Sequence, residues 1–164
     1  MSLIVENGTG LSTAESYISV ANADARHTAF GNSAWTGTDA VKEAALRRAT
    51  AYMQQAYRGR WIGSRLTAAQ ALDWPRWGVM LEGFAISSAA IPADVANACA
   101  DLALKALADE LAPDLTRAVI REKVGPLETE YSAFSPESPR YQAIDMMLSA
   151  YLAGAGAMAQ LVRT

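Results

Sequence analysis

Two long segments repeat apolar residues at the spacing of an amphipathic helix, and this pattern constrains the fold more than any other feature of the chain. The first covers 40–57 after a cap at Thr38 or Asp39, and the second covers 92–111 and is ended by Pro113. Apolar residues make up 51% of the chain and charged residues 19%, a balance typical of a globular protein. The two apolar stripes comprise Val41, Ala45, Leu46, Ala49, Tyr52, Met53, Ala56 and Tyr57, and Val95, Ala98, Cys99, Leu102, Ala106, Leu107 and Leu111.

Shorter elements are predicted around these two helices. Ser19 is placed to cap a helix that runs to about Phe30. The stripe of Tyr141, Ile144, Leu148 and Tyr151 predicts another helix within 135–152. We further expect a short strand at 3–6, a short helix at 67–72, an irregular segment at 78–90 and a loose tail or helix at 153–164.

Residues 120–131 predict a β-hairpin with a two-residue turn at Gly125 and Pro126. In that register two opposite-charge pairs lie across the strands, and each contributes a fraction of a kcal/mol. The chain is therefore predicted to be mainly α, a single domain over 1–164 with three to four main helices, one β-hairpin and a short N-terminal strand. The predicted opposed pairs are Val124–Leu127, Lys123–Glu128, Glu122–Thr129, Arg121–Glu130 and Ile120–Tyr131.

Composition favours a protein without catalytic or metal chemistry. Cys99 and His27 are the single cysteine and histidine in 164 residues, so an intramolecular disulfide and a Cys/His metal cluster are excluded. We predict a buried Cys99, a half-exposed His27, no enzyme activity, and neither cofactor nor metal. The net charge of −3 lowers the expectation of phosphate binding without excluding a local basic patch.

Aromatic and basic residues are concentrated in the segment 57–77, and three interpretations stay open. Tyr57, Arg58, Arg60 and Arg65 alternate there with the candidate residues Trp61, Trp74, Arg76 and Trp77. Such a mixture is typical of single-stranded nucleic-acid binding and also of protein–protein contacts. It is equally compatible with a loop that folds onto its own core.

Several ordered stretches resemble a known family. They are "VENGTGLSTAESYISVANADA", "KEAALRRATAYM", "YRGRWIGSR", "QALDWPR", "IPADVANACADLALKAL" and "KVGPLETEY". Together, over roughly residues 3–131, they resemble the small phage proteins labelled DnaT-like single-strand DNA-binding protein. These in turn are similar to the head–tail connector, or head-completion adaptor, proteins of long-tailed phages.

The resemblance implies a mainly helical subunit with a projecting hairpin, and two alternative functions. As a connector, the protein is expected to form a ring between portal and tail, with the portal protein, a tail-side adaptor and its own copies as partners. An acidic lining would let DNA pass through with weak or no binding. The expected location is then the virion, which is assembled in the bacterial cytoplasm, and no membrane partner is expected. The alternative is single-stranded DNA binding. Trp61, Trp74, Arg76 and Trp77 are candidates either for the core of the central loop or for an interface. Candidate contacts in the hairpin are Arg121, Lys123, Glu128 and Glu130.

Overall fold

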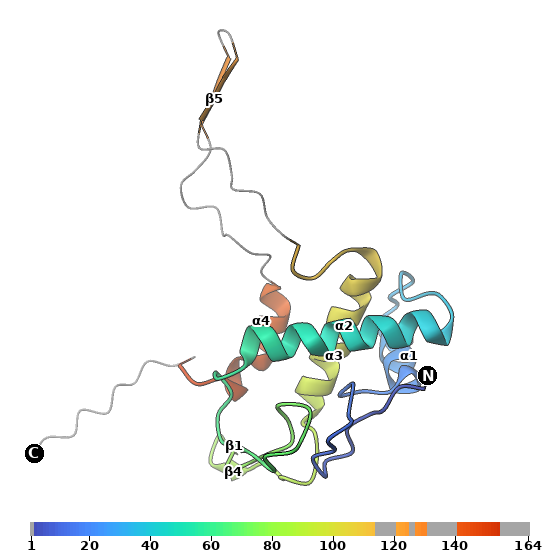
Figure 1. Cartoon of the computed structure of the whole chain (residues 1–164), viewed down its shortest axis with the longest axis vertical. Coiled ribbons are helices and arrows are strands. Elements are labelled where there is room, and N and C mark those ends of the chain that lie inside the picture. Colours follow the sequence, from blue (N-terminus) through green and yellow to red (C-terminus); the bar gives the residue numbers. More distant parts are fainter. Residues whose placement is uncertain (1, 114–120, 125–126, 131–140, 155–164) are drawn as a thin grey trace, which may run out of the picture.

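The computed structural model describes residues 2–113, 121–124, 127–130 and 141–154. Its main helices are α1 (Val20–Ala29), α2 (Asp39–Tyr57), α3 (Ala93–Ala108) and α4 (Gln142–Leu148), and α4 continues into the 3-10 turn η1 (Ser149–Tyr151). Figure 1 shows α2 crossing α3, with α1 towards one end of α2 and α4 towards the other. The prediction of a mainly α fold with a β-hairpin is confirmed.

The contact between α2 and α3 forms the centre of the hydrophobic core. Most of the predicted stripe residues are buried there, and Cys99 lies fully buried with its Sγ 3.3 Å from the Thr50 hydroxyl, as a small core residue. The prediction that Val41 belongs to the buried stripe is wrong, because this residue is 48% exposed. It lies in the first turn of α2, which extends past α3 in Figure 1.

Helix α1 begins where the sequence predicts, since the Ser19 hydroxyl accepts a hydrogen bond from the Asn22 amide at 3.2 Å. His27, however, is buried, and the expectation of a half-exposed histidine is wrong. Its Nε2 lies 3.1 Å from the Ala100 carbonyl oxygen, and its Nδ1 lies 3.1 Å from the side-chain Nδ2 of Asn32. Both ring nitrogens therefore have partners inside the protein, which compensates for removing the ring from water.

The C-terminal helix is shorter than the predicted segment. Ile144 and Leu148 of α4 and Tyr151 of η1 are buried, as their spacing predicts. The Tyr57 hydroxyl donates to Asp145 at 2.7 Å and joins α4 to the end of α2. Residues 135–140 of the predicted helix, and 155–164 of the predicted tail, lie outside the described residues.

The N-terminal segment is organised by a buried carboxylate instead of a regular strand. The predicted strand at 3–6 is present only as a bridge between Val5 and Ser16. Glu6 accepts hydrogen bonds from the backbone amides of Gly8, Gly10 and Leu11 at 2.9–3.0 Å. These bonds curl residues 6–11 into a loop, and backbone hydrogen bonds join Ile4 and Glu6 to Glu15 and Ser16 beyond it.

The predicted hairpin is present with the predicted register. Strands β5 (Arg121–Val124) and β6 (Leu127–Glu130) pair antiparallel, with Arg121 opposite Glu130 and Lys123 opposite Glu128. The turn at 125–126 and the Ile120–Tyr131 pair lie outside the described residues. Two further strand pairs, β1 (Ser64–Arg65) with β2 (Arg76–Trp77) and β3 (Met80–Leu81) with β4 (Phe84–Ala85), were not predicted.

The short helix predicted at 67–72 is absent. Thr67 and Gln70 do exchange the reciprocal hydrogen bonds of a helix-capping box, at 2.8 and 3.1 Å. The Gln70 amide then donates to the carbonyls of Leu72 and Pro75, and Arg65 donates to the Gln70 carbonyl. The Ala71 amide donates to the Leu11 carbonyl at 2.9 Å, so the bond that it would make to the Thr67 carbonyl in a helix does not form. No helix in the described part of the chain is long and apolar enough to span a membrane.

Burial of His27 predicts a dependence of stability on pH. Loss of hydration lowers the pKa of its imidazole below the usual value of 6.5. The unfolded chain therefore takes up a proton as the pH falls through about 6.5, while the folded protein does so only at lower pH. The free energy of unfolding should fall between about pH 7 and about pH 5. Urea unfolding of the native protein and of His27→Gln at several pH values measures this free energy. If it falls equally with pH in both proteins, the prediction is wrong.

Candidate nucleic-acid interface

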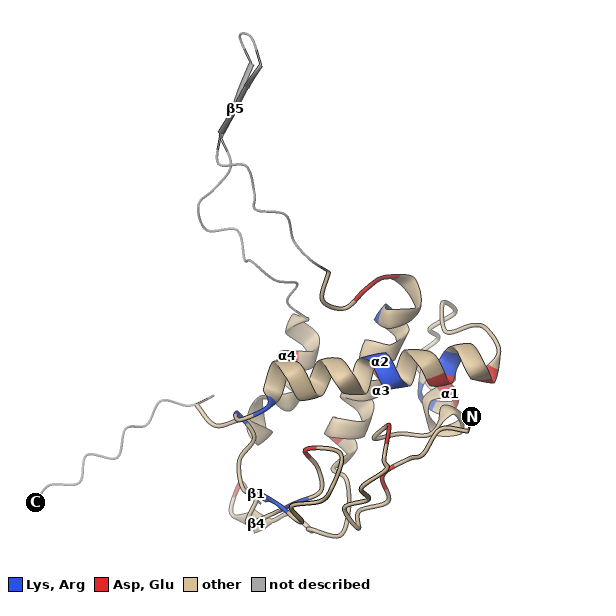
Figure 2. Cartoon of the chain, in the orientation of Figure 1, with Lys and Arg blue, Asp and Glu red and all other residues tan. Residues whose placement is uncertain are grey.

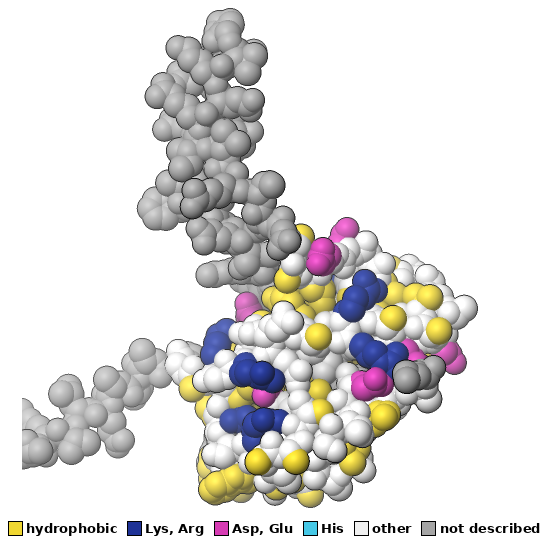
Figure 3. All heavy atoms as spheres, in the orientation of Figure 1, with side chains coloured by type: hydrophobic (Ala, Val, Ile, Leu, Met, Phe, Trp, Pro, Cys, Tyr) yellow, Lys and Arg dark blue, Asp and Glu magenta, His cyan; other side chains and the backbone are white. Residues whose placement is uncertain are grey.

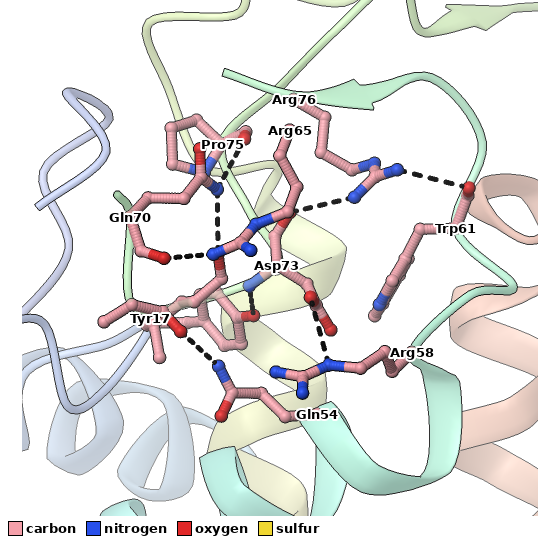
Figure 4. Close-up of polar contacts among 11 residues, drawn as sticks. Tyr17, Gln54, Arg58, Trp61, Arg65, Gln70, Asp73, Pro75 and Arg76 are labelled. Atoms are coloured by element: carbon pink, nitrogen blue, oxygen red, sulfur yellow. Dashed lines mark hydrogen bonds and ion pairs between the residues drawn. The ribbon is translucent and has the colours of Figure 1, made fainter. Parts of the chain in front are cut away.

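The segment 58–91, which links α2 to α3, is organised around the buried guanidinium of Arg76. It donates to the carbonyls of Ile62 at 2.7 Å, Gly63 at 2.6 Å and Asp73 at 3.1 Å. Figure 4 shows the Arg76 guanidinium between Trp61 and Asp73. Burial lowers the pKa of this guanidinium, and Asp73 opposes that effect. Its hydrogen-bonding capacity is used within the protein, so Arg76 is a structural residue of the loop.

Trp61 and Trp74 also belong to the core. They are 5% and 0% exposed, and their rings meet edge to face with centroids 5.8 Å apart. The Trp74 ring meets Tyr151 in the same manner at 5.7 Å. The backbone of Ile62 donates to the Tyr151 carbonyl at 3.0 Å, so η1 and the loop support each other. Of the three interpretations of this segment, the folded-loop one holds for these two tryptophans.

Trp77 differs from the other residues of its motif, because its side chain is 58% exposed. Two more large apolar residues near it are exposed, Met80 at 55% and Phe84 at 74%. Met80 opens the β3–β4 hairpin and Phe84 starts its second strand, across a turn in which Glu82 and Gly83 both have positive φ. The hairpin thus presents apolar side chains to solvent beside Trp77.

Two arginines at the start of the same segment remain accessible. The Arg58 side chain is 65% exposed with its Nε 3.8 Å from Asp73, and Arg60 is exposed with its guanidinium 5.6 Å from the centre of the Tyr57 ring. In Figure 3, Lys and Arg side chains gather over the lower part of this face, above apolar side chains in the region of β1 and β4. We call Arg58, Arg60, Trp77, Met80 and Phe84 the loop face.

Charge is distributed unevenly along the chain. The segment 58–91 holds four arginines against Asp73 and Glu82, a net charge of +2, which leaves −5 for the rest. Figure 2 shows other basic positions along α2. There Lys42 pairs with Asp24 at 2.9 Å, and Arg47 pairs with Glu15 at 2.9 Å. The loop face therefore combines accessible cations and aromatic rings in the one positively charged loop described.

The described residues offer little support for other kinds of site. They contain no group of three or more His, Cys, Asp or Glu side chains able to hold a metal ion. A hollow of about 180 Å³ between α2 and the end of α3 is lined by Arg48, Tyr52 and Leu111 among others. A second hollow adjoins His27 and Trp35, where both ring nitrogens of His27 are already bonded. The absence of enzyme activity stays a prediction.

Sequence reasoning found part of this site and missed part. It singled out Trp61, Trp74, Arg76 and Trp77 together, and the structure buries the first three and exposes the last. It missed Met80 and Phe84, because Glu82 is not a residue typical of a two-residue hairpin turn and only Gly83 marks the turn. Arg121, Lys123, Glu128 and Glu130 lie on the confirmed hairpin, and their role as contacts stays a prediction.

Comparison with known sequences places the chain in a family. The family described as "Putative DnaT-like ssDNA binding protein" matches residues 1–164, so the chain belongs to that family. No curated protein and no solved structure matches the chain. The resemblance to the DnaT-like proteins is thus confirmed, whereas the further likeness to head–tail connectors stays a prediction.

The contrast between two neighbouring tryptophans gives a direct test of the loop geometry. Trp74→Ala should lower the free energy of unfolding by about 3–5 kcal/mol, because it removes a fully buried ring. Trp77→Ala is the matched control and should change it by no more than about 0.5 kcal/mol. Urea unfolding followed by far-UV circular dichroism measures both. Equal losses for the two variants would show that the assignment of core and surface is wrong.

Proposed function

We propose that this protein binds single-stranded DNA through the loop face. The observation that carries the proposal is the joint exposure of Arg58, Arg60, Trp77 and Phe84 in a positively charged segment of an acidic chain. Bases without a complementary strand stack on aromatic rings, and arginines neutralise the phosphates between them. Membership of the DnaT-like family supports this choice of ligand.

The charge distribution also sets the expected strength of binding. The rest of the chain carries a net charge of −5, so it repels phosphates everywhere except at the loop segment. Few cations are available on the loop face, so the salt dependence should be that of a small number of phosphate contacts. Exposed rings then supply a large share of the affinity, with little preference for base sequence.

Two kinds of variant separate these contributions. Arg58→Gln combined with Arg60→Gln should weaken binding of a labelled oligonucleotide and reduce the slope of log K against log salt by about 1.4, since each phosphate contact on a single strand contributes about 0.7. Phe84→Ala should weaken binding by about 1–3 kcal/mol for a lost stacked base while leaving that slope unchanged. Fluorescence anisotropy at several salt concentrations measures both quantities.

The matched control is Arg48→Gln, which removes an exposed arginine on α2 outside the loop face. It should leave affinity nearly unchanged. If the native protein gives flat anisotropy at low salt, DNA binding is ruled out. If Arg48→Gln weakens binding as much as the loop variants do, the site has been placed on the wrong surface.

The head–tail adaptor is the second candidate function, and the apolar character of the β3–β4 hairpin favours it. Phe84 and Met80 are exposed side chains of the kind that protein partners cover. In this case the protein would form a ring with copies of itself, and its other partners would be the portal protein and the tail-side adaptor. It would be located in the virion. The 121–130 hairpin would be a further contact.

A phage particle assay distinguishes the adaptor from the DNA-binding protein. In a phage that encodes the protein, Phe84→Ser should reduce the yield of joined, infectious particles if the hairpin contacts another virion protein. Arg58→Gln with Arg60→Gln should leave that yield unchanged. Normal particle yields after deletion of the whole gene would contradict the adaptor function.

A further inference from the structure

Several buried polar atoms of the loop segment lack hydrogen-bond partners among the described residues. They are Nε1 of Trp61, Nε of Arg65, Nε1 of Trp74 and Oδ2 of Asp73. A buried polar group left without a partner costs about 1–3 kcal/mol, so such groups are normally satisfied by protein or by ordered water. Trp61 and Asp73 are the two among these residues whose unpartnered donor and acceptor face each other.

Asp73 and Trp61 approach each other from opposite sides of the loop interior. The Asp73 side chain is 5% exposed, and its Oδ1 lies 3.8 Å from the Arg58 Nε, too far for a short hydrogen bond. Figure 4 shows the nitrogen-bearing edge of the Trp61 ring turned towards the Asp73 carboxylate. An N–H donor and a carboxylate acceptor thus face the same space, and neither has a partner there.

The chemistry of this pair selects the ligand. An anion would be repelled by the Asp73 carboxylate, and a cation would face the positive end of the indole N–H bond. A water molecule can accept from the indole and donate to the carboxylate at the same time. We propose that a buried water molecule bridges Trp61 Nε1 and Asp73 Oδ2.

The Trp74 indole lies between two other aromatic rings and outside this pair. Its ring meets the rings of Trp61 and Tyr151 edge to face, at interplanar angles of 87° and 83°. An aromatic face can accept a weak hydrogen bond from an N–H group. The proposed water contacts Trp61 and Asp73, and it stabilises the start of the segment that carries the loop face.

The four tryptophans provide the test within one molecule. Trp35 Nε1 donates directly to Asp24, Trp77 is exposed, and Trp61 faces Asp73. In ¹⁵N-labelled native protein, rotating-frame Overhauser spectra at the water frequency should show a dipolar contact between water and the Trp61 indole proton, with the sign that excludes hydrogen exchange. The Trp35 indole proton should show no contact with water. The laboratory-frame Overhauser spectrum should differ in sign between the long-lived water at Trp61 and the mobile water at Trp77.

Two variants of Asp73 complete the experiment. Asp73→Asn keeps an oxygen acceptor and should retain the water contact, whereas Asp73→Leu should abolish it. If either variant fails to fold, the spectrum of the native protein decides alone. A Trp61 indole proton without a water contact, shielded from exchange in the native protein, would indicate a direct bond to Asp73 and overturn the proposal.

Discussion

The buried guanidinium of Arg76 is the interaction on which the loop between α2 and α3 depends. Four backbone carbonyls that the loop cannot pair in helices or sheets receive hydrogen bonds from this one side chain. A buried cation is costly unless its donors are used, and here the carbonyls and the nearby Asp73 carboxylate compensate for that cost. Because Arg76 fixes Ile62, Gly63 and Asp73 relative to one another, it also positions Trp61 and Trp74 in the core.

This arrangement assigns different roles to arginines that are close in sequence. Arg76 holds the loop together from inside, whereas Arg58 and Arg60 remain accessible at its beginning. The aromatic residues divide in the same way, since Trp61 and Trp74 are buried and Trp77 and Phe84 reach solvent. A loop rich in cations and rings is thus part core and part surface. Only the surface part is available to a nucleic acid or to another protein.

Local patterns predicted the elements whose bonds are local. The Ser19 cap, helix α2 and the register of the 121–130 hairpin follow from spacing, because the groups that pair lie within a few residues of one another. The same reasoning failed where a residue pairs with a partner that is distant in the sequence. The capping-box bonds of Thr67 and Gln70 form without a helix, because the Ala71 amide donates to the distant Leu11 carbonyl at 2.9 Å. His27 lies on a polar helix yet is buried against the Ala100 carbonyl of α3.

The sequence by itself determined that this chain is mainly helical, has no cysteine pair, and concentrates positive charge and aromatic rings between its two longest helices. Those properties depend on residue type and on short-range periodicity. Tertiary structure alone decided which of those rings and cations face water. Burial is set by contacts between distant segments, such as η1 with Trp74 and Tyr17 with the Asp73 backbone, and no local pattern encodes them.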